Sequence, residues 1–200
     1  LSKNINAVNL LQKYHNKIDW YWLSENPNAI HILEQNIDKI HWDQLSKNPN
    51  GINLLLENSS KIDWNIISNN PSALCIIEQN IEKINWIELS TNPKAIHLLE
   101  QNKDKIDWFW LSENPNAIHI LENNLDKIHW ASLSKNPNAL DLLEQNQNKI
   151  NWDELCTNTN PRAIKLLEQN IDKISWYRLS SNPSAISLLE KHKHNIDWNV

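Results

Sequence analysis

Residues 20–41 read WYWLSENPNAIHILEQNIDKIH and residues 42–63 read WDQLSKNPNGINLLLENSSKID, so one 22-residue pattern directly follows another. The pattern extends over all 200 residues, and one copy is two residues longer than the rest. A fixed period of this length is the signature of a stacked repeat protein. We therefore expect one helical repeat array over residues 1–200, with a partial repeat at each end. Each copy starts at a tryptophan: Trp20, Trp42, Trp64, Trp86, Trp108, Trp130, Trp152, Trp176 and Trp198.

Each repeat contains two helix-start signals when the tryptophan is numbered position 1. Asp, Asn or Ser at position 22 is a good N-cap for a helix that opens at the next tryptophan, and only His41 and His129 depart from this. Gln44, Glu88 and Glu154 stand where a capping box needs them. The second signal is Asn-Pro, in which Asn caps the helix and Pro takes its first position. In residues 20–41 this predicts a second helix from Pro27 to about Gln35.

The remaining repeated positions predict how the helices end and pack. Asn at position 17 can adopt the left-handed conformation that closes a helix. Ala at position 10 allows neighbouring helices to approach closely. The apolar spacing of three to four residues, with Asn-Pro in each repeat, argues against strands. We expect an all-α fold, an elongated α-solenoid of nine 22-residue two-helix repeats with no β-sheet.

Composition excludes several classes of function. A net charge of −5 argues against a binder of nucleic-acid phosphates, and no apolar run is long enough to span a membrane. Cys75 and Cys156 fall at different repeat positions and predict no disulfide framework, so we expect a reducing, intracellular compartment. A single glycine leaves no phosphate-binding loop, and no catalytic constellation stands apart from the repeat, so we expect no enzyme and no cofactor. The absence of methionine suggests an excerpt or a processed form.

The repeat W-x-x-L-S-x-N-P-x-A-I-x-L-L-E-x-N-x-x-K-I resembles the short two-helix repeats of α-solenoid proteins along the whole chain. In length it is similar to leucine-rich-variant-type repeats. With its Asn, Ile and Lys bias it also resembles repeat arrays predicted in giant DNA viruses of amoebae. The resemblance implies a binding or scaffolding role, in host cytoplasm or a virion, and supplies no catalytic residues.

Function is expected where the repeats differ, which is mainly at positions 2, 3 and 12. Repeat proteins present such positions as an extended binding surface, and aromatic residues and Arg are frequent interface anchors. The alternative is that these rings fold back onto the neighbouring repeat as core. Residues 19–50 and 107–138 differ at only five positions, so their aromatic pairs are copies of one duplication. The candidate partner contacts are Tyr21, Trp22, His31, Phe109, Trp110, His119, Tyr177 and Arg178.

Three other features have simpler interpretations. His97 and His119 share a position in adjacent repeats but fall short of a zinc ligand set, so we expect no metal site. The rows of Glu at position 15 and Lys at position 20 are interpreted as a flanking ladder, either from Glu to Lys or from Glu to a neighbouring helix N-terminus. The two extra residues within 156–160 predict a bulge in a surface turn, with a local kink or a docking site as the alternative.

These observations favour a protein–protein interaction scaffold that binds an unidentified protein partner, with no nucleic acid and no membrane. The alternative is a structural, self-assembling protein, such as a virion or matrix component, with end-to-end association through uncapped ends. A third hypothesis, one nucleotide per repeat, conflicts with the net acidity and the scarcity of Arg.

Overall fold

The structure, a computed structural model, describes residues 1–199, and these residues form only helices and the turns between them. There are seventeen α-helices and nine short 3-10 helices in this range, and no strand. The predicted all-α fold is confirmed, and neighbouring helices pack in sequence order, as in a repeat solenoid. The chain divides into two compact units, an N-terminal unit (Leu1–Lys105) and a C-terminal unit (Ile106–Val200). One continuous array across both units stays a prediction.

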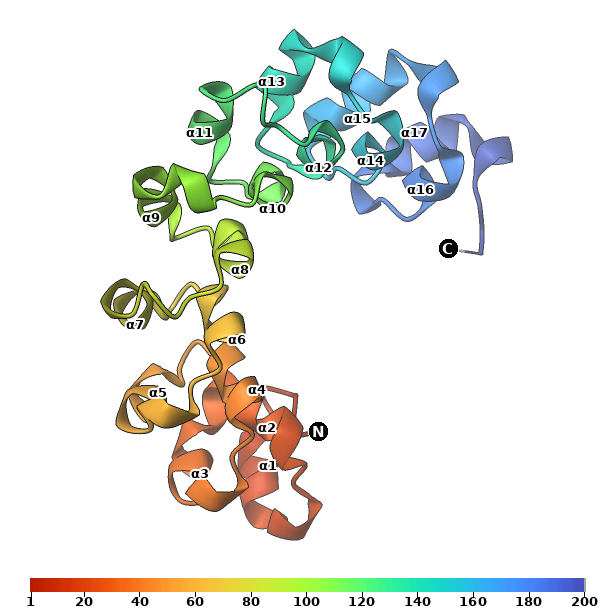
Figure 1. Ribbon diagram of the computed structural model, residues 1–200. Helices are drawn as coiled ribbons and strands as arrows, with labels where there is room; N and C mark the ends of the chain where they lie inside the picture. The colour runs from red at the N-terminus through yellow and green to blue at the C-terminus, as the bar shows by residue number, and fades with distance from the viewer. Residues whose placement is uncertain (200) are drawn as a thin grey trace. The chain divides into compact units, whose positions relative to one another are not determined.

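Each repeat opens with a short α-helix at its tryptophan, the first helix. The Asp63 carboxylate accepts hydrogen bonds from the backbone N–H groups of Asn65 and Ile66, both at 3.0 Å, and so caps the next helix as predicted. His129 also caps its helix, through Nδ1, whereas Ser175 makes no capping bond. Within each unit the first helices lie in one row (Figure 1). They are α2 (Trp20–Glu25), α4 (Trp42–Lys47), α6 (Trp64–Ser68), α8 (Trp86–Thr91), α10 (Trp108–Glu113), α12 (Trp130–Lys135), α14 (Trp152–Leu155) and α16 (Trp176–Ser180).

The second α-helix of most repeats begins three residues later than predicted. Pro27 opens a 3-10 helix, and the α-helix starts at Ile30. In most other repeats the proline lies in a turn closed by a backbone bond, such as Ala73 N–H to Asn70 C=O at 3.0 Å. Asn-Pro therefore reverses the chain between the two helices before the α-helix begins. The second helices are α1 (Val8–Lys13), α3 (Ile30–Glu34), α5 (Ile52–Glu57), α7 (Leu74–Gln79), α9 (Ile96–Gln101), α11 (Ile118–Glu122), α13 (Leu140–Gln145), α15 (Pro161–Glu168) and α17 (Ile186–Lys191).

Position 17 ends the second helix by a mechanism other than the predicted one. No residue in 1–199 has a left-handed backbone, and Asn36 has a φ of −140°. Its side-chain Nδ2 instead donates to the Ile32 carbonyl at 2.8 Å, which satisfies an acceptor that the helix end leaves unpaired. The same bond to the residue four positions earlier recurs at Asn58, Asn80, Asn102, Asn124, Asn146 and Asn170.

Short 3-10 helices complete the repeats. Most follow the second helix and lead the chain to the next N-cap, and two begin at a proline between the first and second helices. They are η1 (His15–Lys17), η2 (Pro27–Ala29), η3 (Ile37–Lys39), η4 (Ser59–Lys61), η5 (Lys103–Lys105), η6 (Gln147–Lys149), η7 (Ile171–Lys173), η8 (Pro183–Ala185) and η9 (Lys193–Asn195).

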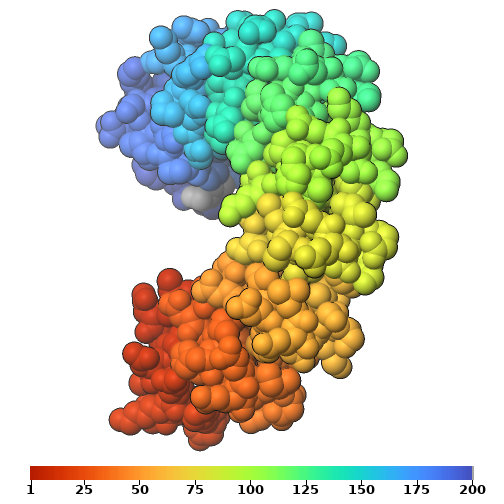
Figure 2. Space-filling view, turned by 90° about the vertical axis from the view of Figure 1, so that its left-hand side faces the viewer, coloured from red at the N-terminus to blue at the C-terminus, as the bar shows by residue number. Residues whose placement is uncertain are grey.

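The apolar core lies between the first and second helices of successive repeats. In the repeats that begin at Trp20 to Trp176, the Leu at position 4 and the Ala at position 10 are fully buried, as Leu45 and Ala73 illustrate. Helices of this length are marginal in isolation, so they depend on packing against neighbouring repeats. In the space-filling view, residues 1–105 accordingly form successive bands in sequence order (Figure 2, red to yellow-green).

A buried serine at position 5 connects each first helix to the start of the next. The Ser24 hydroxyl donates to the Trp20 carbonyl at 2.7 Å and accepts from the backbone N–H of His41 at 3.0 Å. In a capping box the backbone N–H of the N-cap residue would donate to the side chain at N3. Here that N–H donates to the serine instead, so the capping boxes predicted at Gln44, Glu88 and Glu154 are wrong. The same acceptance from the next N-cap recurs at Ser2, Ser46, Ser68, Ser112, Ser134 and Ser180.

A buried asparagine at position 7 holds each repeat to the one before it, and we call this series the asparagine ladder. Nδ2 of Asn48 donates to the carbonyls of Ser24 at 3.0 Å and Asn26 at 2.9 Å, both in the preceding repeat. Its Oδ1 accepts from the backbone N–H of Asn50 at 2.9 Å, so the amide satisfies groups on both sides. The ladder includes Asn26, Asn48, Asn70, Asn92, Asn136, Asn158 and Asn182.

The ladder shows where the two extra residues lie. Asn158, and not Asn160 of the Asn-Pro pair, donates to the Ser134 and Asn136 carbonyls. Asn160 makes the bond to the Pro137 carbonyl that position 9 makes elsewhere. The insertion therefore follows Asn160 and lengthens the start of α15, so the predicted bulge in a surface turn is wrong.

Cys156 stands at position 5, where the other full repeats have serine. It is completely buried. Burial raises the pKa of its thiol above the ordinary value of a cysteine, against the opposing effect of a hydrogen bond from the Ser175 backbone N–H. Asp153 adds to this rise and Arg178 opposes it. The thiol is therefore protonated and shielded at neutral pH.

We expect Asn48→Ala to lower the free energy of unfolding by about 3 kcal/mol, because it leaves two buried carbonyls and one N–H without partners. Asn50→Ala is the control, since it removes one exposed bond to the Pro27 carbonyl and costs about 1 kcal/mol or less. Urea unfolding followed by circular dichroism measures both. Equal midpoints for the two variants would contradict a structural role for the ladder.

We expect Ellman's reagent to titrate one thiol in the native protein at neutral pH, the exposed Cys75, and a second only after unfolding. Cys75→Ser removes the fast reaction and Cys156→Ser leaves it.

Stability also falls above about pH 9, because the unfolded thiol ionises there while the folded thiol stays protonated. This loss is smaller in Cys156→Ser. Equal reaction rates for both thiols would refute the buried state.

Candidate functional site

Five exposed aromatic side chains lie at positions 2 and 3 of the first helices. Trp22 on α2 is 40% exposed and Trp110 on α10 is 39% exposed, and each has an exposed ring beside it, Tyr21 or Phe109. Tyr177 on α16 is 63% exposed. The Trp22 and Trp110 rings at position 3 are thus packed against the protein on one side and exposed to solvent on the other. They are therefore neither wholly core nor wholly surface residues.

These aromatic residues form two similar clusters, one in each unit. The N-terminal ring cluster is Tyr21, Trp22 and His41, in which the Tyr21 ring meets Trp22 edge to face at 5.0 Å and lies 5.4 Å from His41. Such edge-to-face pairs are favoured by the ring quadrupoles. His41 is the N-cap residue of α4, so the cluster joins α2 to the start of the next first helix.

The C-terminal ring cluster is Phe109, Trp110 and His129. The Phe109 ring lies 5.0 Å from Trp110 and 4.6 Å from His129. The imidazole of His129 is fixed because its Nδ1 accepts the Ser132 backbone N–H at 3.2 Å. The cluster reproduces the first one, as the duplicated sequence predicts, so the two give matched sites for comparison.

Positions 3 and 6 of the first helices also form a row of alternating charge in the C-terminal unit. Lys135 Nζ lies 3.2 Å from Glu113 Oε1 and 3.6 Å from Glu154 Oε2. Arg178 donates to the same Glu154 oxygen at 3.1 Å. Arg178, a predicted partner contact, is therefore already paired within the chain.

Position 12 belongs to a different set of contacts on the second helices. Nε2 of His31 on α3 lies 2.6 Å from Nε2 of Gln12, and Nε2 of His97 lies 2.9 Å from the Glu78 carboxylate. His119 occupies the same exposed position on α11. These contacts join position 12 to position 15 of the preceding repeat, so the histidines act between repeats, and the aromatic clusters do not include His31 or His119.

The lysines at position 20 do not form the ladder with Glu that was predicted from their spacing. The Lys39 ammonium lies 4.9 Å from the centre of the Trp20 ring in its own repeat, within the range of a cation–π contact. The half-buried Trp20 ring is therefore covered by a cation. The same pairing is present for Lys83, Lys105, Lys127 and Lys173.

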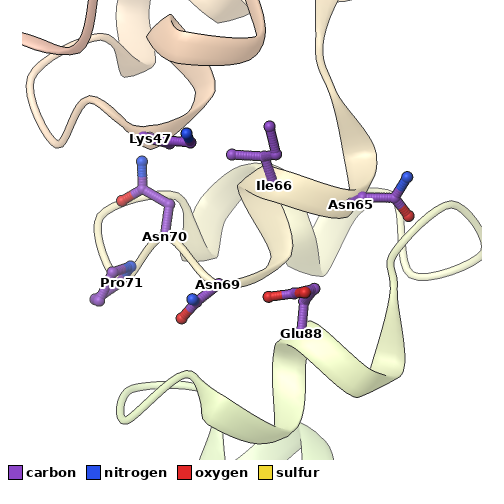
Figure 3. A pocket seen from close by; sticks show the side chains of 7 residues that line it. All are labelled: Lys47, Asn65, Ile66, Asn69, Asn70, Pro71 and Glu88. Carbon is purple, nitrogen blue, oxygen red and sulfur yellow. The ribbon is translucent and has the colours of Figure 1, made fainter.

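A groove of about 440 Å³ in the N-terminal unit was not predicted from the sequence. Ile66 projects from α6 between Lys47 of α4 and Glu88 of α8 (Figure 3). The groove is formed by residues of three successive repeats, so no single repeat reveals it. The groove gives the first helices a hollow surface with an apolar centre and charged flanks. Its other lining residues are Asn65, Asn69, Asn70 and Pro71.

Metal-binding clusters and membrane-spanning helices are absent from the described residues. Among residues 1–199 no three His, Cys, Asp or Glu side chains are grouped so that they could hold a metal ion, and neither cysteine is in a disulfide. The helices of this range are all too short or too polar to cross a membrane. Comparison with protein-family models, curated proteins and solved structures found no match.

We expect Tyr177→Ala to change the free energy of unfolding by about 0.5 kcal/mol or less, because most of the ring is in solvent. Leu179→Ala in the same helix is the control and costs about 2–5 kcal/mol, since Leu179 is fully buried. Urea unfolding compares the two. Similar losses would mean that Tyr177 is a core residue and not part of an open surface.

Proposed function

We propose that this chain is a non-enzymatic scaffold that binds a protein partner through the exposed side chains of its first helices. The ring clusters carry this proposal. Within residues 1–199 seven aromatic side chains are exposed, and five of them stand at positions 2 and 3 of first helices: Tyr21, Trp22, Phe109, Trp110 and Tyr177. Exposed aromatic groups that are held rigidly are frequent anchors of protein interfaces.

The surroundings of the rings support the same interpretation. The backbone beneath them is held by the asparagine ladder and the serines, so a partner meets a surface that needs little ordering on binding. The groove at Ile66 lies on the same row of helices in the N-terminal unit as Tyr21 and Trp22. A binder of extended protein segments needs such a row of anchors and hollows.

Affinity capture from a lysate of the cells that make the protein tests the proposal. We expect partners of the wild-type chain to be lost with the double variant Trp22→Ala, Trp110→Ala, because the ring clusters lose their largest member. The control is Leu56→Ala, Leu125→Ala, which removes two similarly exposed apolar side chains outside the first helices.

Identical partners for the tryptophan variant and the wild type would contradict the proposal. The competing interpretation, a structural protein that assembles with itself, instead predicts that the bait recovers further copies of this chain and little else.

A further inference from the structure

A cation of the chain itself sits on one of the two ring clusters. The Lys3 ammonium lies 4.6 Å from the centre of the Trp22 ring and 3.7 Å from Glu25 Oε2. Trp22 and Glu25 are three residues apart on α2, so ring and carboxylate share one helix face. An aromatic face and a carboxylate together attract an ammonium group from two sides.

The same pair of groups stands in the C-terminal unit. Trp110 and Glu113 on α10 have the same spacing, within the sequence Trp-Leu-Ser-Glu that α2 also contains. Trp110 is 39% exposed and Trp22 is 40%, and the Glu113 and Glu25 side chains are 28% and 30% exposed. The two pairs therefore share their spacing and exposure, although Glu113 also accepts from Lys135 and from the Ser132 hydroxyl, both at Oε1.

The occupant differs between the two copies. Lys3 stands 19 residues before Trp22, and the residue 19 before Trp110 is the uncharged Thr91. None of the lysines and arginines among residues 106–199 lies over the Trp110 ring. Within its own unit the Trp22 ring is therefore covered by a cation, and within residues 106–199 the Trp110 ring is not.

The charges beside Trp110 leave a role for an external cation. The Lys135 ammonium pairs with Glu113 Oε1, and it also pairs with Glu154, so its charge is divided between two carboxylates. Asp107 lies at the start of the same helix, where its carboxylate accepts the Trp110 backbone N–H at 3.1 Å. The whole chain carries a net charge of −5, which also favours a basic partner.

We propose that Trp110 and Glu113 bind a lysine or arginine side chain of a basic protein segment, in the way that Trp22 and Glu25 hold Lys3. This rests on the proposed scaffold function and gives the partner a chemical class. The Phe109 ring packs against Trp110 and is itself packed against His129, so both are positioning residues for this site.

Indole N–H resonances in ¹H–¹⁵N spectra test the proposal, with Trp22 and Trp110 assigned by single Trp→Phe variants. Titration with hexalysine is expected to shift the Trp110 signal and leave the Trp22 signal in place. Fully acetylated hexalysine, which carries no side-chain charge, is expected to shift neither. Hexaarginine in a parallel titration shows whether ammonium or guanidinium is preferred, and a Trp110 shift with either supports a cation site.

Three variants make the test specific. Lys3→Thr is expected to make the Trp22 signal respond to hexalysine, because it gives that ring the residue found before Trp110. Glu113→Gln is expected to weaken the Trp110 response roughly two- to fivefold. Glu57→Gln on α5 removes the same charge elsewhere and is expected to leave the response unchanged.

Equal shifts with the acetylated peptide, a silent Trp22 in Lys3→Thr, or equal effects of Glu113→Gln and Glu57→Gln would each overturn the cation site. The titration uses no natural partner. A failed titration together with aromatic-dependent capture would therefore remove the cation site and leave the scaffold function standing.

Discussion

The structure depends on one side chain that satisfies three backbone groups at once. The amide of Asn48 donates to two carbonyls of the preceding repeat and accepts one N–H of its own turn. Aspartate has the acceptor but neither donor, and serine cannot supply two donors, so only asparagine fits at this length. Because the groups are buried, each one left unpaired costs free energy. This requirement explains why position 7 keeps asparagine while positions 2, 3 and 12 vary.

The fold was predictable because its period and its caps are local signals. Tryptophans every 22 residues, Asp or Asn before them and apolar spacing of three to four residues predicted short stacked helices correctly. The asparagine ladder was not predictable in the same way, since its partners lie 22 and 24 residues earlier and local pattern assigns Asn-Pro to a helix start. The insertion shows the difference most clearly. Sequence aligns Asn160 with the other Asn-Pro pairs, whereas the buried carbonyls select Asn158.

The candidate surface was predictable only in part, for a related reason. Variation among repeats pointed to Tyr21, Trp22, Phe109 and Trp110, which do stand exposed on first helices, although their role in binding is a prediction. The groove at Ile66 went unnoticed because it needs three neighbouring repeats to exist. Arg178 was expected to face a partner, but Glu154, one repeat earlier, already holds it. Whether a variable side chain is exposed or already paired depends on contacts between repeats, and the pattern within one repeat does not reveal these contacts.

Positions 3 and 6 of the first helices follow a common rule of complementarity. A cation or anion at one repeat meets its counterpart on the next, as Lys135 does between Glu113 and Glu154. The ladder carries the stacking, so these pairs are free to change from repeat to repeat with little effect on the fold. An outside cation can add to such a row beside a ring that no cation covers, as at Trp110 within residues 106–199. Duplication of a block copies the rings but not the residues of the repeat that precedes it. A copied site can in this way lose its own occupant and become a site for a partner.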